Sequence, residues 1–346
     1  MRKHYIDNIR WICVLLLFPY HILMIYNNWG EDFYIHGGAL LIPSVFNSIL
    51  SFWMMPLLFA VAGISSRYAL EKRSAGEYIK ERVNKLLLPF IFGVLLVVPI
   101  QPYIAGLYFN GGAGYFDSFT KVTDLSGYDG AFTPGHLWFI LFLFVISMVC
   151  LPFILLYKDK GKGTLGSKMP LILVMLMGLL PCIGSLVKIG GQSTKSPTEY
   201  LAYFLLGYFF LCNDTLLEKS DRYRFLLLGS SVLYSCFTRF IIDGEFYEMA
   251  SWLWILTVLG MGRRYLNFNG KITAYLSNAS FGIYLFHQSW IIIAAYYIFQ
   301  LTNNPPAQMA LIFLVSVPAT FATYEICRRI GVTRFLLGIK KHETVT

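Results

Sequence analysis

The chain has 346 residues, of which 56% are hydrophobic, 17% aromatic and only 14% charged, and its mean hydropathy is +0.58. Soluble domains carry about 25% charged residues, so this composition excludes a soluble globular protein. The net charge of +9 is distributed among short loops, with no basic stripe and no interleaved stacking aromatics. Nucleic acid is therefore not an expected partner.

The first apolar segment, 9–27, contains an ionisable side chain, His21, and is preceded by Asp7 and interrupted near its start by Arg10. At about 100° per residue, these three side chains share one face of a helix. His21 lies on the order of 16 Å along the helix from Arg10, near the middle of a ~30 Å hydrocarbon layer. Ionisable groups are costly at that depth, so the pattern predicts catalysis or transport inside the membrane.

Apolar segments along the whole chain predict an all-α polytopic membrane protein with ten transmembrane helices. The segments are 9–27, 43–65, 86–107, 136–157, 169–188, 198–213, 223–242, 249–262, 275–301 and 307–327. Lys and Arg gather in alternate loops, among them 66–85 and 158–168, which predicts that both termini are cytoplasmic. We expect residues 1–346 to form a single multi-pass domain of a bacterial-type inner membrane, with no fused soluble domain and the first segment as a signal anchor. The six cysteines form no C-x-x-C pair, so no metal site is expected.

Several motifs occur in an order typical of one family. The segment Tyr5–Arg10 followed by His21 resembles the opening of the type-3 integral-membrane acyltransferases, and is most similar to their periplasmic-glucan succinyltransferase branch. Lys85 departs from the family pattern, which usually has a second arginine there; lysine keeps the charge but lacks the bidentate fork. The other matching segments are Met54–Gly63, Arg82–Pro89, His136–Phe139, Ser280–His287 and Tyr324–Glu325.

The resemblance implies transfer of a short acyl group, acetyl or succinyl, from acyl-coenzyme A to a hydroxyl of an extracytoplasmic glycan or glycolipid. His21 is the candidate base or transient acyl carrier, because a neutral imidazole near pH 7 accepts a proton. Arg10, oriented by Asp7, is placed to meet a donor phosphate or a polarised carbonyl. His287 is a second catalytic imidazole or the group that positions one. The candidate donor-binding residues are Arg10, Arg67, Arg82 and Lys85.

Each assignment has a structural alternative. His21 is also typical of a hydrogen-bonding strut between helices. Arg67, Arg82 and Lys85 satisfy the positive-inside rule whether or not they bind phosphate. His136 and Trp138, which begin the fourth span at the predicted outer surface, are candidates for substrate binding.

For Trp138, an interfacial anchor competes with a sugar-stacking role. Tyr284 and Glu325 are further candidates for substrate binding, through their motifs. Glu325 is equally typical of a helix-end ion pair with Arg328 or Arg329, or of a link to the active-site arginines.

Two other function classes fit the same residues. A transporter or exporter of a small anion or acylated metabolite would use the Arg, His and carboxylate groups for binding and proton relay. A lipid-linked sugar flippase, or a structural partner in envelope assembly, is the other alternative to an enzyme. The expected partners are membrane lipid and a glycan or glycolipid acceptor, and the sequence leaves homo-oligomerisation open.

Overall fold

The computed structural model describes residues 3–30, 33–112, 114–157, 169–187, 195–242, 244 and 246–339. Within these ranges the regular structure is helical and contains no β-strand, which confirms the predicted all-α class. The basic loop 158–168 lies outside the described residues, as does the last residue of the predicted span 169–188.

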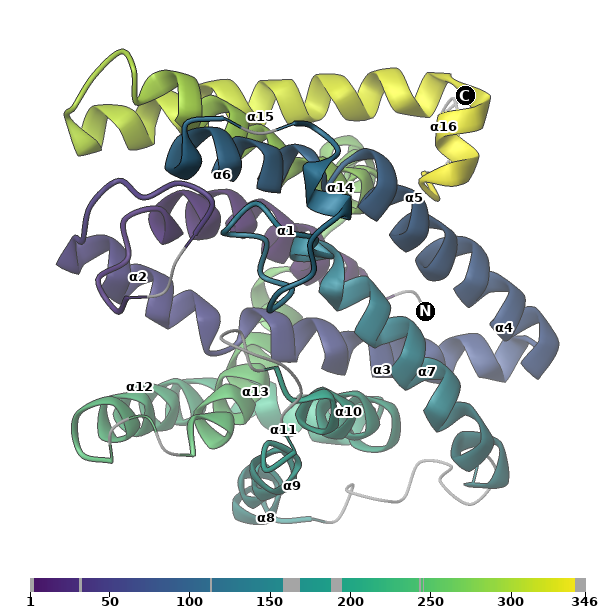
Figure 1. Cartoon of the computed structure of the whole chain (residues 1–346). Coiled ribbons are helices and arrows are strands. Elements are labelled where there is room, and N and C mark those ends of the chain that lie inside the picture. The colour runs from purple at the N-terminus through teal and green to yellow at the C-terminus, as the bar shows by residue number, and fades with distance from the viewer. Residues whose placement is uncertain are drawn as a thin grey trace.

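The chain contains both long uninterrupted helices and shorter ones (Figure 1). The α-helices are α1 (His4–Met24), α2 (Leu41–Ser51), α3 (Met54–Lys72), α4 (Ala75–Arg82), α5 (Leu88–Leu96), α6 (Ile100–Asn110), α7 (Trp138–Tyr157), α8 (Leu171–Leu176), α9 (Leu179–Gly184), α10 (Pro197–Leu206), α11 (Asp214–Arg222), α12 (Arg224–Phe240), α13 (Tyr247–Tyr265), α14 (Lys271–Ile298), α15 (Pro305–Arg329) and α16 (Gly331–Leu336). Two π-helical segments, η1 (Val83–Leu87) and η4 (Gly207–Leu211), continue α4 and α10, and two 3-10 turns are η2 (Asp117–Phe119) and η3 (Gly135–Leu137).

Six helical segments of the described chain are long and apolar enough to cross a membrane. The number becomes seven if α10 with η4 and α11, bent by 98° at a short break, form one span. Helices occupy all ten predicted segments, but α12 has 17 residues and the stretch Leu171–Gly184 is shorter still. The structure thus establishes six or seven spanning helices by length and composition, and does not establish ten.

Helix α1 lies in the interior of the molecule, where it contacts α2, α3, α13, α14 and α15 (Figure 1). Its buried side chains are spread along its whole length rather than along one narrow stripe. A helix that is apolar around most of its circumference is stable only when neighbours surround it. The helix that carries His21 is therefore also the helix around which the others pack.

Two glycines allow α3 to cross the α10–η4 segment at very short range. A Cβ added to Gly63 would come within 2.0 Å of the Phe204 carbonyl oxygen, and one added to Gly207 within 2.0 Å of the Ala60 carbonyl oxygen. Small residues at such crossings let helix backbones approach within a membrane. Gly63 ends the second sequence motif, so that motif has a packing function here.

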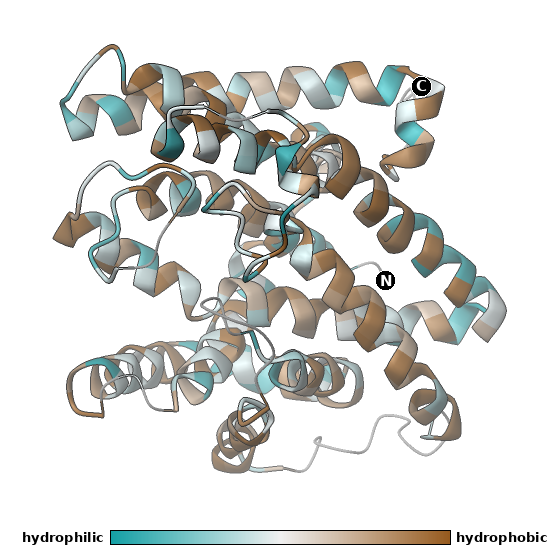
Figure 2. Cartoon of the chain, in the orientation of Figure 1, coloured by the Kyte–Doolittle hydropathy of each residue, from teal (hydrophilic) through white to brown (hydrophobic). Residues whose placement is uncertain are grey.

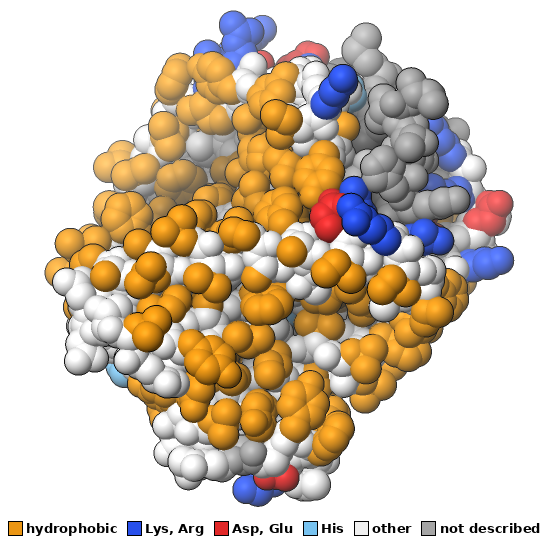
Figure 3. Space-filling model, turned by 90° about the horizontal axis from the view of Figure 1, so that it is seen from above, with side chains coloured by type: hydrophobic (Ala, Val, Ile, Leu, Met, Phe, Trp, Pro, Cys, Tyr) orange, Lys and Arg blue, Asp and Glu red, His pale blue; other side chains and the backbone are white. Residues whose placement is uncertain are grey.

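Large apolar side chains are exposed over much of the outer surface. Leu156 and Leu186, for example, keep 73% and 80% of their side chains exposed. Figure 2 shows long hydrophobic stretches on α5 and α7, and Figure 3 shows an extensive hydrophobic face with charged side chains mainly towards its margins. A soluble monomer rarely exposes such a continuous apolar surface, so this one is suited to contact lipid.

Candidate active site

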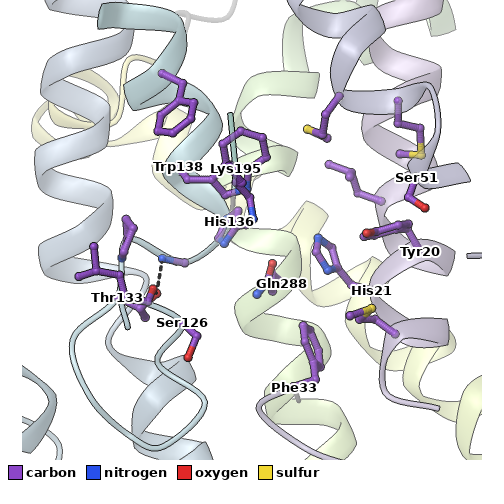
Figure 4. Close-up of a pocket in the computed structure, with 18 of the residues that line it drawn as sticks. Tyr20, His21, Phe33, Ser51, Ser126, Thr133, His136, Trp138, Lys195 and Gln288 are labelled. Atoms are coloured by element: carbon purple, nitrogen blue, oxygen red, sulfur yellow. Dashed lines mark hydrogen bonds between the residues drawn. The ribbon is translucent and has the colours of Figure 1, made fainter. Parts of the chain in front are cut away.

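A cavity of about 570 Å³ opens beside the C-terminal half of α1. Its walls come from the first turns of α3, α7 and α10 and from the loops that precede α2 and α7, and α14 contributes Tyr284 and Gln288 (Figure 4). Its lining is mainly aromatic and aliphatic with a limited set of polar groups, as is typical of ligand sites. The polar lining residues other than tyrosines are His21, Ser51, Asp124, Ser126, Thr133, His136, Lys195, Glu199 and Gln288.

Three imidazoles from three different helical segments meet at this cavity. The ring centres of His21 and His287 are 5.2 Å apart, and those of His136 and His287 are 5.0 Å apart. His21 and His136 line the cavity, whereas His287 lies behind them and is completely buried. The tertiary structure thus joins His21 of α1 to His287 of α14, two residues that are far apart in the sequence.

Hydrogen bonding fixes the neutral tautomer of His287. Its Nδ1 lies 2.7 Å from the Tyr284 carbonyl oxygen, which only accepts, so Nδ1 carries the proton and donates it. Nε2 of the neutral ring then bears the lone pair, and it is buried without a hydrogen-bond partner. Nδ1 of His21 is likewise buried without a partner. Buried polar atoms are rarely left unsatisfied, so these two nitrogens mark a place where a substrate group can bind.

His136 belongs to a different network. Its Nε2 lies 3.1 Å from the Leu285 carbonyl oxygen and must donate, so Nδ1 accepts from the Gln101 amide at 3.2 Å. The Tyr284 hydroxyl donates to the His136 backbone carbonyl at 2.5 Å. Both nitrogens of His136 are therefore engaged, and with 6% exposure the residue is buried within the protein.

Trp138 lines the cavity instead of projecting into an interfacial belt. Its ring centre lies 5.3 Å from that of Tyr200 and 5.4 Å from that of Phe142, and the Lys195 ammonium lies 4.9 Å from the ring centre. The ring thus packs against other cavity residues, and both of its predicted roles remain predictions.

The loop before α7 closes one side of the cavity through a hydrogen-bonded turn. The Asp124 carboxylate accepts from the Ser126 hydroxyl at 2.6 Å and from the Ser126 amide at 2.9 Å. The hydrogen bond from the Ser126 hydroxyl is the main reason that the pKa of Asp124 lies below its usual value. The Tyr34 hydroxyl donates to the Ser126 carbonyl at 3.0 Å, which ties this loop to the one after α1.

A second polar group of residues lies at the other half of α1. Arg10 Nη1 is 3.2 Å from a carboxylate oxygen of Asp7, the pair that the sequence predicted, and Arg10 Nη2 donates to the Ser65 hydroxyl. The Arg82 guanidinium donates to the Ser66 hydroxyl at 2.9 Å. Arg10 and Arg82 thus meet adjacent serines of α3, although 72 positions separate them in the sequence.

Arg67 directly follows Ser66 on α3, and we refer to Arg10, Arg67 and Arg82 together as the basic cluster. Arg82 lies over the Tyr78 ring at 4.6 Å, and its Nε is buried without a hydrogen bond. The Arg67 guanidinium pairs with Glu71 at 3.3 Å and lies 5.5 Å from the centre of the Tyr208 ring. A set of guanidinium groups with an unsatisfied buried N–H has the chemistry needed to bind an anion such as a phosphate.

Two predicted residues have local partners. Lys85, on the π-helical segment η1, pairs with Glu81 at 2.5 Å. Glu325 pairs with Arg328 at 2.6 Å and accepts from the Tyr275 hydroxyl at 2.8 Å, which is the helix-end ion pair that was one of its alternatives. Neither residue lines the cavity.

The structure thus separates the predicted site residues into two places. The cavity contains His21, His136, Trp138 and Tyr284, with His287 directly behind them; Arg10, Asp7, Arg67, Arg82, Lys85 and Glu325 are not among its lining residues. Within the described ranges, no group of three or more His, Cys, Asp or Glu side chains is arranged to hold a metal ion.

Several cavity residues were not predicted from the sequence. Gln288 lines the cavity and, with Gln101 behind it, forms the hydrogen-bonded network with His136, and Tyr200 and Lys195 are further lining residues. The sequence did contain one signal for the two glutamines, because each is a polar amide inside an apolar segment. Gln288 also directly follows His287, the last residue of a motif. Lys195 had no such signal, because it lies in a loop.

Comparison with known proteins identifies relatives of the family that the sequence motifs resemble. A family model described as an acyltransferase domain matches residues 3–325. The chain is similar to glucans biosynthesis protein C of Escherichia coli K12 (DH10B), with 23% identity over 382 residues that cover 98% of this chain and 95% of that protein. It is 25% identical to glucans biosynthesis protein C of Escherichia coli O17:K52:H18 over 377 residues, with the same coverage. No solved structure matches the chain.

Proposed function

Since this chain belongs to the acyltransferase-domain family, as its motifs predicted, and is an acyltransferase with several membrane helices, we propose its substrates. The donor is a short-chain acyl-coenzyme A, acetyl or succinyl, and the acceptor is a hydroxyl of an extracytoplasmic glycan or glycolipid. The name of the similar Escherichia coli proteins, which refers to glucans, supports a glycan acceptor. The cavity, with its aromatic walls and few polar groups, is suited to hold a sugar ring.

The observation that carries the proposal is the pair of imidazoles on α1 and α14. Their ring centres are 5.2 Å apart, and each ring has one buried nitrogen without a hydrogen bond. His21, which lines the cavity, is the base that takes the proton of the acceptor hydroxyl, or the group that carries the acyl chain. His287, behind it, is the second catalytic imidazole or the group that positions the first. Deprotonating the hydroxyl makes it a better nucleophile towards an acyl carbon.

The basic cluster is the proposed binding site for the donor's phosphates. Arg10, Arg67 and Arg82 supply charge-assisted N–H donors, and Asp7 orients Arg10. Coenzyme A supplies the activated thioester carbonyl. From Arg10 to His21 the distance along α1 is on the order of 16 Å, so the thioester arm would have to pass between α1 and its neighbours to reach the cavity.

We further propose ten spans with both termini on the cytoplasmic side of a bacterial inner membrane. Helices occupy all ten apolar segments, and the start of α1 and helix α16 lie towards the same side of the molecule in Figure 1. Arg10 lies near the start of α1, and Arg82 of α4 lies beside the same part of α3, whereas the cavity adjoins the other end of α1. This separation is expected if donor and acceptor approach from different sides.

The proposal is tested by release of free coenzyme A from purified protein in detergent, with acetyl-CoA or succinyl-CoA as donor and a short glucan oligosaccharide as acceptor. We expect glucan-dependent release, and a loss of about 10²- to 10⁴-fold in kcat for His21→Gln, the range typical of a lost general base. His36→Gln is the matched control, because His36 is exposed and is not a cavity residue.

Retention of the parental rate by correctly folded His21→Gln would refute the catalytic role of His21. A carrier, by contrast, would move an acyl compound across vesicles without releasing coenzyme A from donor and acceptor. That outcome would refute the enzyme mechanism proposed here.

A further inference from the structure

Gln288 has a buried oxygen that nothing in the protein satisfies. The side chain is 3% exposed and lines the cavity, and its Oε1 has no hydrogen-bond partner. Figure 4 shows it between His136 and His21. An unsatisfied buried acceptor is costly to keep, so its presence in a cavity indicates a ligand that supplies a hydrogen-bond donor.

A directional series of hydrogen bonds sets which end of the Gln288 amide faces the ligand. The series starts at the Leu285 carbonyl, which forces His136 to donate from Nε2 and to accept at Nδ1. Gln101 must therefore present its NH₂ to His136, at 3.2 Å, and its Oε1 to Gln288. The Gln288 NH₂ donates to that oxygen at 3.2 Å, and its own Oε1 is left without a partner.

A second contact supports this orientation of Gln101. Its NH₂ also donates to the Ser289 hydroxyl at 3.0 Å, and that hydroxyl donates to the Val97 carbonyl at 2.9 Å. Because the Ser289 proton is used on a carbonyl, Ser289 can only accept from Gln101. Two independent backbone carbonyls, those of Leu285 and Val97, thus impose the same amide orientation.

We propose that Gln288 is a binding residue for the acceptor substrate, whose hydroxyl donates to Oε1 beside the His21 and His287 rings. This inference rests on the proposed function and names one contact within it. A hydroxyl matches Oε1 because it is a donor, whereas the thioester, an acetyl group and an ionised succinyl carboxylate offer only acceptors. Gln288 therefore favours the polyhydroxylated acceptor over the acyl end of the donor, and by holding one hydroxyl of the acceptor it helps to orient a different hydroxyl, the one that gives its proton to His21.

The test compares Gln288→Met, which keeps the side-chain length but removes the acceptor oxygen, with Gln300→Met. Gln300 is exposed, lies just beyond the end of the same helix and bonds only locally, to the Tyr296 carbonyl. Steady-state kinetics use acetyl-CoA and succinyl-CoA with a short glucan oligosaccharide. We expect Gln288→Met to lower kcat/KM for the glucan about ten-fold, the size of one hydrogen bond, with the KM for the donor unchanged. Gln300→Met should behave as the parent.

A second variant, Gln101→Met, keeps Gln288 and the cavity wall but releases the Gln288 amide from its fixed orientation. It should also lower kcat/KM for the glucan, by less than Gln288→Met. Unchanged glucan kinetics in both variants, or an effect of Gln288→Met on the KM of the donor alone, would overturn the inference. If the parent itself does not acylate the glucan, the proposed glycan acceptor fails first, so the two failures are distinguishable.

Discussion

The three histidines of the cavity differ in the hydrogen bonds that they make. His136 uses both ring nitrogens within the protein, and His287 uses only Nδ1, towards the Tyr284 carbonyl. His21 has an unpartnered Nδ1 and lines the cavity. A histidine with both nitrogens engaged is suited to hold its neighbours in place, whereas one with a free lone pair is suited to accept a proton. The hydrogen bonds of single residues therefore distinguish His136 from the two imidazoles that keep an unpartnered nitrogen, His21 and His287.

At the same scale, Trp138 is predicted to stack on a sugar ring of the acceptor. Replacing it with leucine should raise the KM for a short glucan oligosaccharide about five-fold, because an aromatic contact of this kind contributes on the order of 1 kcal/mol. The KM for acyl-coenzyme A should stay at the parental value. Trp29→Leu is the control, since Trp29 is 40% exposed and is not a cavity residue. An equal change in both variants would contradict the stacking role.

At the scale of elements, the position of Arg10 and Arg82, the proposed donor-binding residues, depends on how α1 and α4 pack on α3. Ser65 and Ser66 are consecutive on α3, yet one accepts from Arg10 on α1 and the other from Arg82 at the end of α4. The π-helical segment η1 begins directly after Arg82. Such segments often occur at functional sites, because the extra residue per turn changes the direction in which side chains point.

Arg82→Gln is expected to raise the KM for acyl-coenzyme A about ten-fold, because a charge-assisted hydrogen bond to phosphate is lost. The KM for the glucan should not change. The measurement is coenzyme A release at varied donor concentration, with Arg222→Gln as a control that removes an exposed arginine of α11. A shift confined to the acceptor KM would show that the basic cluster does not bind the donor.

The crossing of α3 with α10 and η4 makes a separate prediction about stability. Gly63→Ala should lower the thermal unfolding midpoint, because its Cβ would overlap the Phe204 carbonyl and force the helices apart at a cost of about 1–3 kcal/mol. Gly76→Ala, in α4 with open space around the added methyl group, should leave the midpoint unchanged or raise it. Detergent-solubilised protein in a thermal unfolding assay provides the measurement. Equal midpoints for the two variants would mean that this crossing tolerates separation.

At the scale of the whole molecule, α1 connects two chemically different ends. The cavity with its imidazoles adjoins the C-terminal half of α1, and the Arg10–Asp7 pair lies in its first turns. If α1 crosses the membrane, as its length and apolar composition allow, these ends lie at different depths. One helix thus links a site suited to donor phosphates with a site suited to a hydroxyl acceptor.

This arrangement predicts a sided reaction in proteoliposomes. With the protein inserted in one known orientation, acyl-coenzyme A should support glucan acylation only from the side of Arg10 and Arg82, and the glucan only from the side of the cavity. The measurement is acylated glucan recovered after donor and acceptor are supplied on the same or on opposite sides. Equal activity with both on the cavity side would contradict the two-sided arrangement.

The amino-acid sequence by itself determined the membrane class, the all-helical fold, the family and most of the residues at the two ends of α1. Hydropathy and motif order are local properties, so they can be read without coordinates. The Asp7–Arg10 contact was predictable for the same reason, because it lies within one helical turn. The number of spanning helices could not be predicted in the same way. The segment α10–η4–α11 bends and α12 is short, and hydropathy alone does not reveal either feature.

Only the tertiary structure decided which residues share a site. In the folded protein the ring centres of His21 and His287 are 5.2 Å apart, and His136 is buried. Trp138 lines the cavity, whereas Glu325 forms an ion pair at the end of α15. The tertiary structure also joined Gln101 to Gln288, 187 positions further along the chain. The physical reason is that the rotation and crossing of packed helices set which side chains meet, and those angles depend on contacts between distant segments rather than on the spacing within one.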